Sequence, residues 1–238
     1  MIFVSAVFTV YSGDHSDRHD YTQKLLGWLR VLCSVVPVHV VCEPSLESTI
    51  REIPGAIAIP LAFEDTDVYK SMRHARRLPV ARNLMKDTHE YMMVINGKPE
   101  YVRRVRDAGY VSDRYVWIDA GIAKVLSDPP RLLRDMMKRC ETLPMDSIVI
   151  PGCWSTPCEA LYSQVCWRFC GGLFVVPDSL VERFADAVLL ECARLEDLAI
   201  WEVNVWASIE HSLPILWVPG DHNDRLFDLK TDRPISNE

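Results

Sequence analysis

Four short stretches of this chain carry polar or glycine-rich residues of the kind that bind charged ligands. They are Asp119 with Gly121, Lys98 between Gly97 and Pro99, the Gly171-Gly172 pair, and Gly220-Asp221-His222. Glu202 is a fifth candidate, at the start of an expected helix. Lysine pairs with phosphate as a point charge, and glycines let backbone N–H groups approach phosphate oxygens. Carboxylates and histidine can share a metal ion with phosphates. The set predicts a pocket for an anionic, polyhydroxylated ligand.

Asp119 is the candidate whose position is most informative. The β-branched and aromatic run 115–118 ends on this carboxylate, and Ala120 and Gly121 follow. Such a run predicts a buried strand, which delivers Asp119 to the edge where open α/β sheets place their ligands. The small pair keeps the next turn thin, so that a ligand can approach the backbone. Asp119 then suits a divalent cation or a sugar hydroxyl; the alternative is that it caps a helix.

The other candidates also have ordinary structural explanations. A lysine before proline, such as Lys98, is often solvent-exposed, and a Gly-Gly pair is as often a bulge or a tight turn. His222 fits a capped loop equally well. Glu202 fits a helix start, where the helix dipole favours negative charge. The residues alone leave both interpretations open.

The hydrophobic pattern predicts alternating strands and helices. Strands are expected at 2–10, 38–42 and 56–61, with helices at 21–34 and 45–52 between them. Such alternation predicts a parallel sheet with right-handed crossovers. Further strands are expected at 115–118, 146–151, 169–177 and 213–218, and further helices at 68–77, 81–96, 99–107, 131–140, 179–195 and 201–209. The expected fold class is α/β, with a mostly parallel central sheet flanked by helices.

Two segments between these elements are expected to lie near a ligand. The polar loop 11–20 follows the first strand and belongs at the ligand edge. It contains no Gly-x-Gly-x-x-Gly, so a dinucleotide fingerprint is absent. Residues 152–168 are rich in tryptophan and cysteine and predict a loop or lid, in which Trp154 and Trp167 suit stacking on a sugar.

Composition limits the class of protein. The 238 residues are 49% hydrophobic, enough for the core of one domain over 1–230, with 231–238 as a tail. A net charge of −7 argues against nucleic acid as a partner. No apolar run reaches the ~18–20 residues of a membrane span, and the alternating N-terminus predicts a strand rather than a signal peptide. The eight cysteines form no Cys-x-x-Cys pair, so reduced thiols in a cytoplasmic protein are expected and structural zinc is not.

Four motifs together carry a family resemblance. They are Val94-Ile-Asn-Gly-Lys98-Pro, Tyr115-Val-Trp-Ile-Asp119-Ala-Gly-Ile, Cys170-Gly-Gly-Leu-Phe-Val and Gly220-Asp-His. In this order, over residues 80–225, the chain resembles the HtrL (YibB)-type family of glycosyltransferases. It is more distantly similar to GT-A glycosyltransferases of the glycogenin type. The resemblance implies one GT-A-like (Rossmann-like) domain, with a nucleotide-binding half over residues 1–125 and an acceptor half over 126–230.

The resemblance also implies roles for single residues. It places Asp119 and His222 on Mn²⁺ or Mg²⁺. It implies catalytic roles for Asp119, Glu202 and Asp221, and donor-binding roles for Lys98, Gly121, Arg82, Asn96, Gly171 and Gly172. One departure matters: where the glycogenin type has Asp-Ala-Asp, this chain has Asp119-Ala-Gly121, so one expected metal carboxylate is missing.

The function implied is transfer of a sugar from a nucleotide-sugar donor, with a UDP-sugar favoured, to a glycan or other hydroxyl acceptor. Two alternatives stay open. A non-catalytic module that binds nucleotide-sugars is favoured by the missing second carboxylate. A sugar nucleotidyltransferase would need a glycine-rich phosphate loop after the first strand, and that segment has only Gly13.

Overall fold

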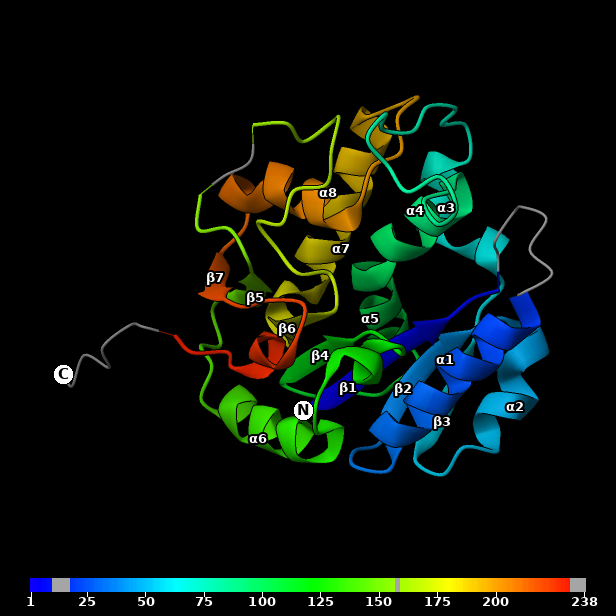
Figure 1. Ribbon diagram of the computed structural model, residues 1–238, viewed down its shortest axis with the longest axis vertical. Coiled ribbons are helices and arrows are strands. Elements are labelled where there is room, and N and C mark those ends of the chain that lie inside the picture. Colours follow the sequence, from blue (N-terminus) through cyan, green and yellow to red (C-terminus); the bar gives the residue numbers. More distant parts are fainter. Residues whose placement is uncertain (10–17, 157–158, 232–238) are drawn as a thin grey trace.

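The computed structural model describes residues 1–9, 18–156 and 159–231, which form one α/β structure (Figure 1). Its strands are β1 (Ile2–Val7), β2 (Val38–Cys42), β3 (Ala56–Pro60), β4 (Arg114–Ile118), β5 (Ile148–Gly152), β6 (Leu173–Pro177) and β7 (Ile215–Pro219). Its helices are α1 (Arg18–Cys33), α2 (Glu47–Arg51), α3 (Asp67–Met72), α4 (His89–Asn96), α5 (Lys98–Asp107), α6 (Pro129–Glu141), α7 (Asp178–Arg194) and α8 (Glu202–Ile209).

The seven strands form one sheet in the order β3-β2-β1-β4-β6-β5-β7. All strands run parallel except β6, which is antiparallel to both of its neighbours, β4 and β5. The predicted α/β class with a mostly parallel sheet is therefore confirmed. The strand order reverses between β1 and β4, and ligands of open α/β sheets bind in the crevice outside such a point. Because β6 is antiparallel to its neighbours, its first residues lie at the edge of the sheet where the other strands end.

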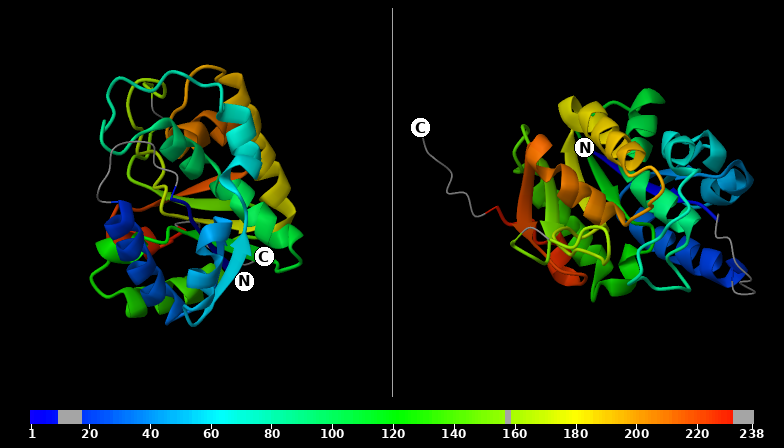
Figure 2. Two further views of the ribbon diagram at one scale, coloured as in Figure 1. Left: turned by 90° about the vertical axis from the view of Figure 1, so that its right-hand side faces the viewer. Right: turned by 90° about the horizontal axis from the view of Figure 1, so that it is seen from above.

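The sheet separates two hydrophobic cores. Alternate residues of a strand point to opposite faces, so Val4 and Trp117 belong to one core and Phe3 and Ile118 to the other. Helices α1, α2 and α6 cover one face, toward the bottom of Figure 1, and α4, α5, α7 and α8 lie on the other. Figure 2 shows the sheet between these two layers. Both faces are covered, which explains why the strands are predominantly apolar.

Two predictions fall partly outside the described residues. The first strand ends at Val7 rather than at residue 10. The loop expected at the ligand edge, residues 11–20, includes residues 11–17, which lie outside the described residues. Of the predicted tail, residues 232–238 are not described either.

The prediction of a helix over 81–96 is wrong in its first half, since α4 begins only at His89. Before it, the backbone N–H of Asn83 donates to Asp87 at 3.0 Å, and the Asn83 side chain accepts from the N–H of Met85 at 3.0 Å. Such local bonds offer the backbone an alternative to the helix. Leu84 is 72% exposed, so the apolar spacing over this segment does not correspond to a buried face.

Gly109 follows the end of α5 with φ +94°, a left-handed conformation that favours glycine. None of the helices in the described part of the chain is both long enough and apolar enough to cross a membrane.

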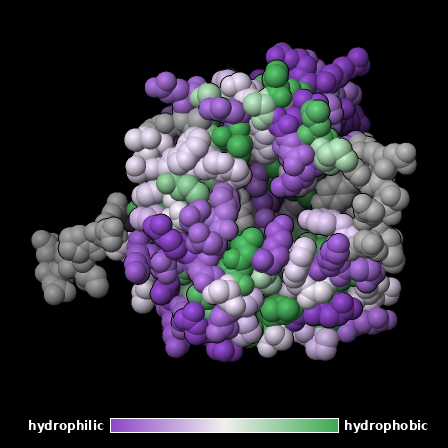
Figure 3. All heavy atoms as spheres, in the orientation of Figure 1, coloured by the Kyte–Doolittle hydropathy of each residue, from purple (hydrophilic) through white to green (hydrophobic). Residues whose placement is uncertain are grey.

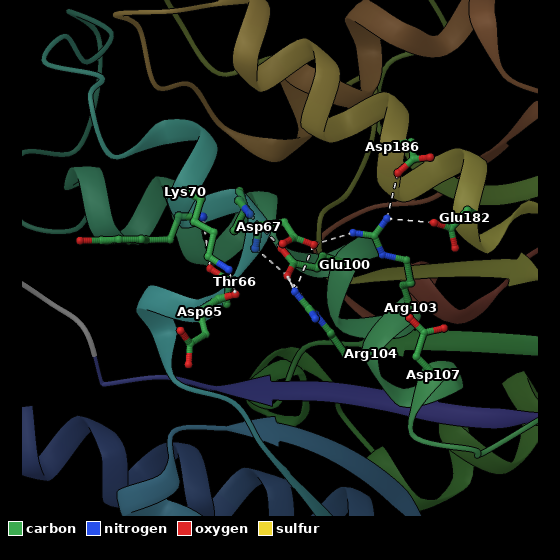
Figure 4. Close-up of polar contacts among 12 residues, drawn as sticks. Asp65, Thr66, Asp67, Lys70, Glu100, Arg103, Arg104, Asp107, Glu182 and Asp186 are labelled. Atoms are coloured by element: carbon green, nitrogen blue, oxygen red, sulfur yellow. Dashed lines mark hydrogen bonds and ion pairs between the residues drawn. The ribbon is translucent and has the colours of Figure 1, made fainter.

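A buried carboxylate fixes the beginning of α5, the helix that carries Lys98. Glu100 is 1% exposed and accepts hydrogen bonds from the N–H groups of Asp67 and Val68, at 2.8 and 2.9 Å, at the start of α3. Arg104 donates to the same carboxylate at 2.9 Å (Figure 4). Free N–H groups and the positive end of a helix dipole both favour such a charge. Glu100 therefore joins α5 to α3.

Glu100→Gln tests this link. An amide has only one acceptor oxygen, so its NH₂ group would face a backbone N–H. We expect the free energy of unfolding in urea to fall by about 1–3 kcal/mol. Glu182→Gln is the control, because Glu182 is 52% exposed and its ion pairs with arginine should contribute less than about 1 kcal/mol. Equal losses in the two variants would contradict the capping role.

Candidate functional site

Lys98 lies at the centre of a buried charge cluster. It is 4% exposed, and its Nζ lies 2.7 Å from Glu202 Oε1, 2.8 Å from the carbonyl oxygen of Gly171 and 3.1 Å from Asp119 Oδ1. Burial alone lowers the pKa of Lys98, but the charges of Asp119 and Glu202 and their hydrogen bonds outweigh it, so the pKa is raised. The ammonium is charged, and its three N–H donors all have partners.

Asp119 lies directly after β4, where the sequence places it. Its backbone N–H donates to the carbonyl of Gly172 at 3.0 Å, and its Oδ1 accepts from Trp117 Nε1 at 2.8 Å. The side chain is nevertheless 39% exposed. No side-chain cap is found at the following 3₁₀ helix, Ile122–Val125, so the carboxylate does not serve as its cap. Asp119 is held in place and remains accessible.

A cavity of about 170 Å³ opens beside Asp119. Its walls come from β1, α1, α4, α5, the end of β4 and the 3₁₀ helix after it. The face of the molecule in Figure 3 is hollowed near its centre, between α4 and α1. The charged residues that line the cavity are Lys86, Lys98, Lys124 and Asp119. The cavity is thus positive in a chain whose net charge is −7.

Aromatic side chains supply much of the remaining wall. Tyr21, Tyr91 and Trp117 line the cavity, and Lys86 Nζ lies 4.7 Å from the ring centre of Tyr91. The pKa of Tyr21 is raised by burial and then by the charge of Asp119. A cavity with aromatic walls and a few charged groups is the usual form of a small-molecule site.

The two glycines before β6 are required by close packing. A Cβ on Gly171 would lie 2.1 Å from Glu202 Oε1 and 3.3 Å from Lys98 Nζ. A Cβ on Gly172 would lie 2.7 Å from Ile122 Cδ1. The carbonyl of Gly171 accepts a hydrogen bond from Lys98 Nζ, and the carbonyl of Gly172 accepts one from the backbone N–H of Asp119. Both glycines lie in a turn before β6, as the ordinary structural explanation allows; Gly171 packs against the charge cluster and Gly172 against Ile122.

Asn96 and Arg82, predicted to bind the donor, lie elsewhere. Asn96 is buried, and its Nδ2 donates to the carbonyls of Met92 and Ile200 at 2.8 Å each, which joins α4 to the segment before α8. Arg82 donates to the carbonyl of Pro79 at 3.1 Å. Neither residue is among those that line the cavity. Gly121, in contrast, does line it.

His222 and Asp221 lie in the loop after β7, beside two thiols. The side chains of Cys153, Cys170 and His222 bring their ligand atoms within 4.8 Å of one another. In residues 1–9, 18–156 and 159–231, this is the one such group of three or more potential metal ligands. His222 is thus grouped with cysteines rather than with Asp119, and Mn²⁺ or Mg²⁺ binding by Asp119 and His222 stays a prediction.

The three residues of this group differ in exposure: Cys170 is buried, Cys153 is half-buried and His222 is exposed. Burial raises the pKa of Cys153 and of Cys170. Burial lowers the pKa of His222, although the charge of Asp221 acts in the opposite direction. The His222 ring packs edge-on against Trp167, with ring centres 4.3 Å apart.

The sequence alone does not predict a role for four residues of these sites: Lys124, Lys86, Cys153 and Cys170. Lys124 follows the Asp119 motif closely, and its position in that stretch was the available signal. Lys86 lay within a segment predicted to be helical. Cys153 and Cys170 are seventeen residues apart and form no recognisable metal motif.

No protein-family model matches this chain, and no curated protein matches it by sequence. The resemblance to HtrL-type glycosyltransferases therefore stays a prediction based on the four motifs.

Gly171→Ala tests the packing of the charge cluster. The added methyl group would force Glu202 away from Lys98, and we expect the free energy of unfolding to fall by about 1–3 kcal/mol. Gly27→Ala in α1 is the matched control, because its Cβ would meet nothing within 4 Å. That control should gain about 0.5–1 kcal/mol through helix propensity. Chemical denaturation of both variants measures the difference; a neutral Gly171→Ala would show that the cluster is not tightly packed.

Proposed function

We propose that this chain is a GT-A-like glycosyltransferase that moves a sugar from a nucleotide-sugar donor, with a UDP-sugar favoured, to a hydroxyl group of a glycan or similar acceptor. One observation carries the proposal. An accessible carboxylate, Asp119, stands at the strand-order reversal of an α/β sheet and faces a cavity lined by lysines and aromatic rings. This combination suits a ligand with both a diphosphate and sugar hydroxyls.

The lysines divide into two kinds. Lys98 is buried and its donors are taken by Glu202, Gly171 and Asp119, so its role in the proposal is to position the carboxylates. Lys86 and Lys124 are exposed at the cavity and are the cations that a diphosphate can reach. A unit charge pair 4 Å apart gains about 1–4 kcal/mol near a protein surface.

The two candidate bases differ in access. Glu202 is 7% exposed and paired with Lys98, which suits a positioning role. Asp221 lies in the loop after β7 and is partly exposed, so an acceptor hydroxyl can reach it. Its pKa is lowered, chiefly by the hydrogen bond from the backbone N–H of His222. In the proposal Asp221 faces the acceptor and Asp119 faces the donor.

The protein side chains near Asp119 and His222 do not by themselves form a site for a divalent cation such as Mg²⁺ or Mn²⁺. Asp119 shares its carboxylate with Lys98 and Trp117, and His222 lies with two thiols. This donor set does not by itself make the all-oxygen site that Mg²⁺ or Mn²⁺ prefers. Mn²⁺ or Mg²⁺ would therefore bind only together with the donor, whose phosphate oxygens would supply some of its ligands. No catalytic step is assigned to the ion.

A second candidate function is a non-catalytic module that binds nucleotide-sugars. Two observations favour it. Gly121 stands where a second carboxylate is expected, and all three donors of Lys98 are already satisfied by the protein. Such a module would keep the cavity and its lysines, and it would bind the donor without turnover.

Asp119→Asn distinguishes the enzyme from the module. The amide keeps the side-chain shape but removes the charge, and we expect turnover of the best donor in a panel of UDP-, GDP-, CMP- and dTDP-sugars to fall by roughly 10²–10³-fold. The melting temperature should also fall, because Lys98 loses one of its two carboxylate partners, so turnover is compared at a temperature at which both proteins are folded. Donor binding by a wild-type protein that shows no turnover would favour the module. Equal turnover in wild type and variant would remove Asp119 from catalysis.

Lys86→Met and Lys124→Met test the diphosphate contact. Each should weaken binding of UDP by several-fold at low salt, and the loss should shrink as salt is added, because exposed charges are screened. Lys138→Met is the control, since Lys138 is exposed on α6, outside the cavity lining. Calorimetric titration measures each affinity. A loss of the same size in Lys138→Met would show only a general charge effect.

A further inference from the structure

Three chain segments distant in sequence bring soft metal ligands to one place. Cys153 follows the carboxyl end of β5, and His222 follows that of β7. Cys170 lies just before the two glycines that lead into β6. Since β6 is antiparallel to β5, its beginning lies at the edge where β5 and β7 end. The topology of the sheet thus assembles this group.

The backbone around the group is held by hydrogen bonds and close packing. The N–H of Cys170 donates to the carbonyl of Pro151 at 2.7 Å, and the N–H of Gly220 donates to the carbonyl of Gly152 at 2.9 Å. A Cβ on Gly152 would lie 1.8 Å from the backbone oxygen of Arg168, so the two segments are in direct contact. The ligands are therefore presented by a preorganised frame.

The separation of the sulfur atoms fits a metal ion between them. Cys153 Sγ and Cys170 Sγ are 3.6 Å apart. Two thiolates on one tetrahedral zinc ion, with Zn–S bonds of about 2.3 Å, stand about 3.8 Å apart. A disulfide requires about 2.0 Å. The free thiols therefore already stand near the spacing that a tetrahedral metal imposes.

The loop that carries His222 is positioned by Asp221. Asp221 Oδ1 accepts the backbone N–H of His222 at 2.7 Å and lies 3.7 Å from Cys153 Sγ. The ring of His222 rests against Trp167. Hydrogen bonds and packing that orient a ligand strengthen a metal site.

We propose that Cys153, Cys170 and His222 bind a zinc-type cation, in a site separate from the cavity beside Asp119. Two thiolates and an imidazole select Zn²⁺ or a similar thiophilic ion over Mg²⁺ and Mn²⁺. Three protein ligands leave the fourth tetrahedral position for water or another small donor. Each thiol releases its proton on binding, so affinity rises with pH. The proposal does not depend on the glycosyltransferase function.

This site differs from the expectation that the sequence supports. The absence of a Cys-x-x-Cys pair argues against structural zinc only when both thiols come from one short turn. Here the ligands come from the ends of β5 and β7 and from the beginning of β6, and their grouping depends on the reversed direction of β6.

Metal titration of the purified full-length chain tests the proposal. After chelator treatment under a non-thiol reductant, we expect one equivalent of Zn²⁺ to bind. Co²⁺ should give the intense visible bands of a tetrahedral site and a thiolate-to-cobalt absorption in the near ultraviolet. Cys153→Ser, Cys170→Ser and His222→Ala should each lose more than the roughly 10–100-fold in affinity that an outer-shell change costs. Cys33→Ser is the matched control, because burial raises the pKa of that thiol to about 11 and it lies in α1.

A second measurement uses the unmodified protein, so that a misfolded variant cannot obscure the answer. Bound Zn²⁺ should protect Cys153 and Cys170 from alkylation, as mapped by peptide mass. The proposal is overturned if the reduced wild type binds no stoichiometric Zn²⁺, if Cys33→Ser loses affinity as the ligand variants do, or if Zn²⁺ leaves the alkylation of both thiols unchanged. A Cys153–Cys170 disulfide that persists under the reductant would also overturn it.

Discussion

The arrangement of the ligand edge depends on one buried ammonium group. Lys98 is 4% exposed, and an unpaired charge at that depth would be strongly unfavourable. It is stabilised only if Asp119, Glu202 and the carbonyl of Gly171 all reach it. These partners come from the end of β4, the start of α8 and the entry to β6. The ion pairs therefore contribute less to net stability than to the specific arrangement of four elements, because removing either carboxylate leaves a buried charge incompletely paired.

The antiparallel direction of β6 explains why both the charge cluster around Lys98 and the Cys153, Cys170 and His222 group lie at the edge of the sheet where β4, β5 and β7 end. In an all-parallel sheet, residues that precede a strand lie at the opposite edge from residues that follow one. Reversal of β6 brings Cys170, Gly171 and Gly172 to the edge where Asp119 follows β4. Gly171 then serves the charge cluster, while the adjacent Cys170 faces Cys153 and His222. One reversed strand thus places two groups of candidate functional side chains next to each other.

The local hydrophobic pattern of the sequence predicted the positions of the strands and helices better than it predicted how these elements contact one another. The β-branched runs placed the strands well, and the run before Asp119 correctly put this carboxylate at a strand end. The failure at 81–88 came from Asn83 and Asp87, whose side chains compete with the helix for backbone N–H groups. The direction of β6, the pairing of Lys98 with Glu202 and the thiol group all depend on contacts between distant segments. A single sequence carries no periodic signal for such contacts.

The pairing of Lys98 also bears on how a ligand would be received. Of its two carboxylate partners, Glu202 is buried and Asp119 is 39% exposed. In the proposed function, a diphosphate would therefore meet Asp119, whose negative charge is offset by Lys98, rather than a bare carboxylate. The exposed Lys86 and Lys124 add positive charge at the cavity. An anion can thus approach an acidic side chain in an acidic protein, because the local field beside Asp119 is set by nearby lysines and not by the net charge of the chain.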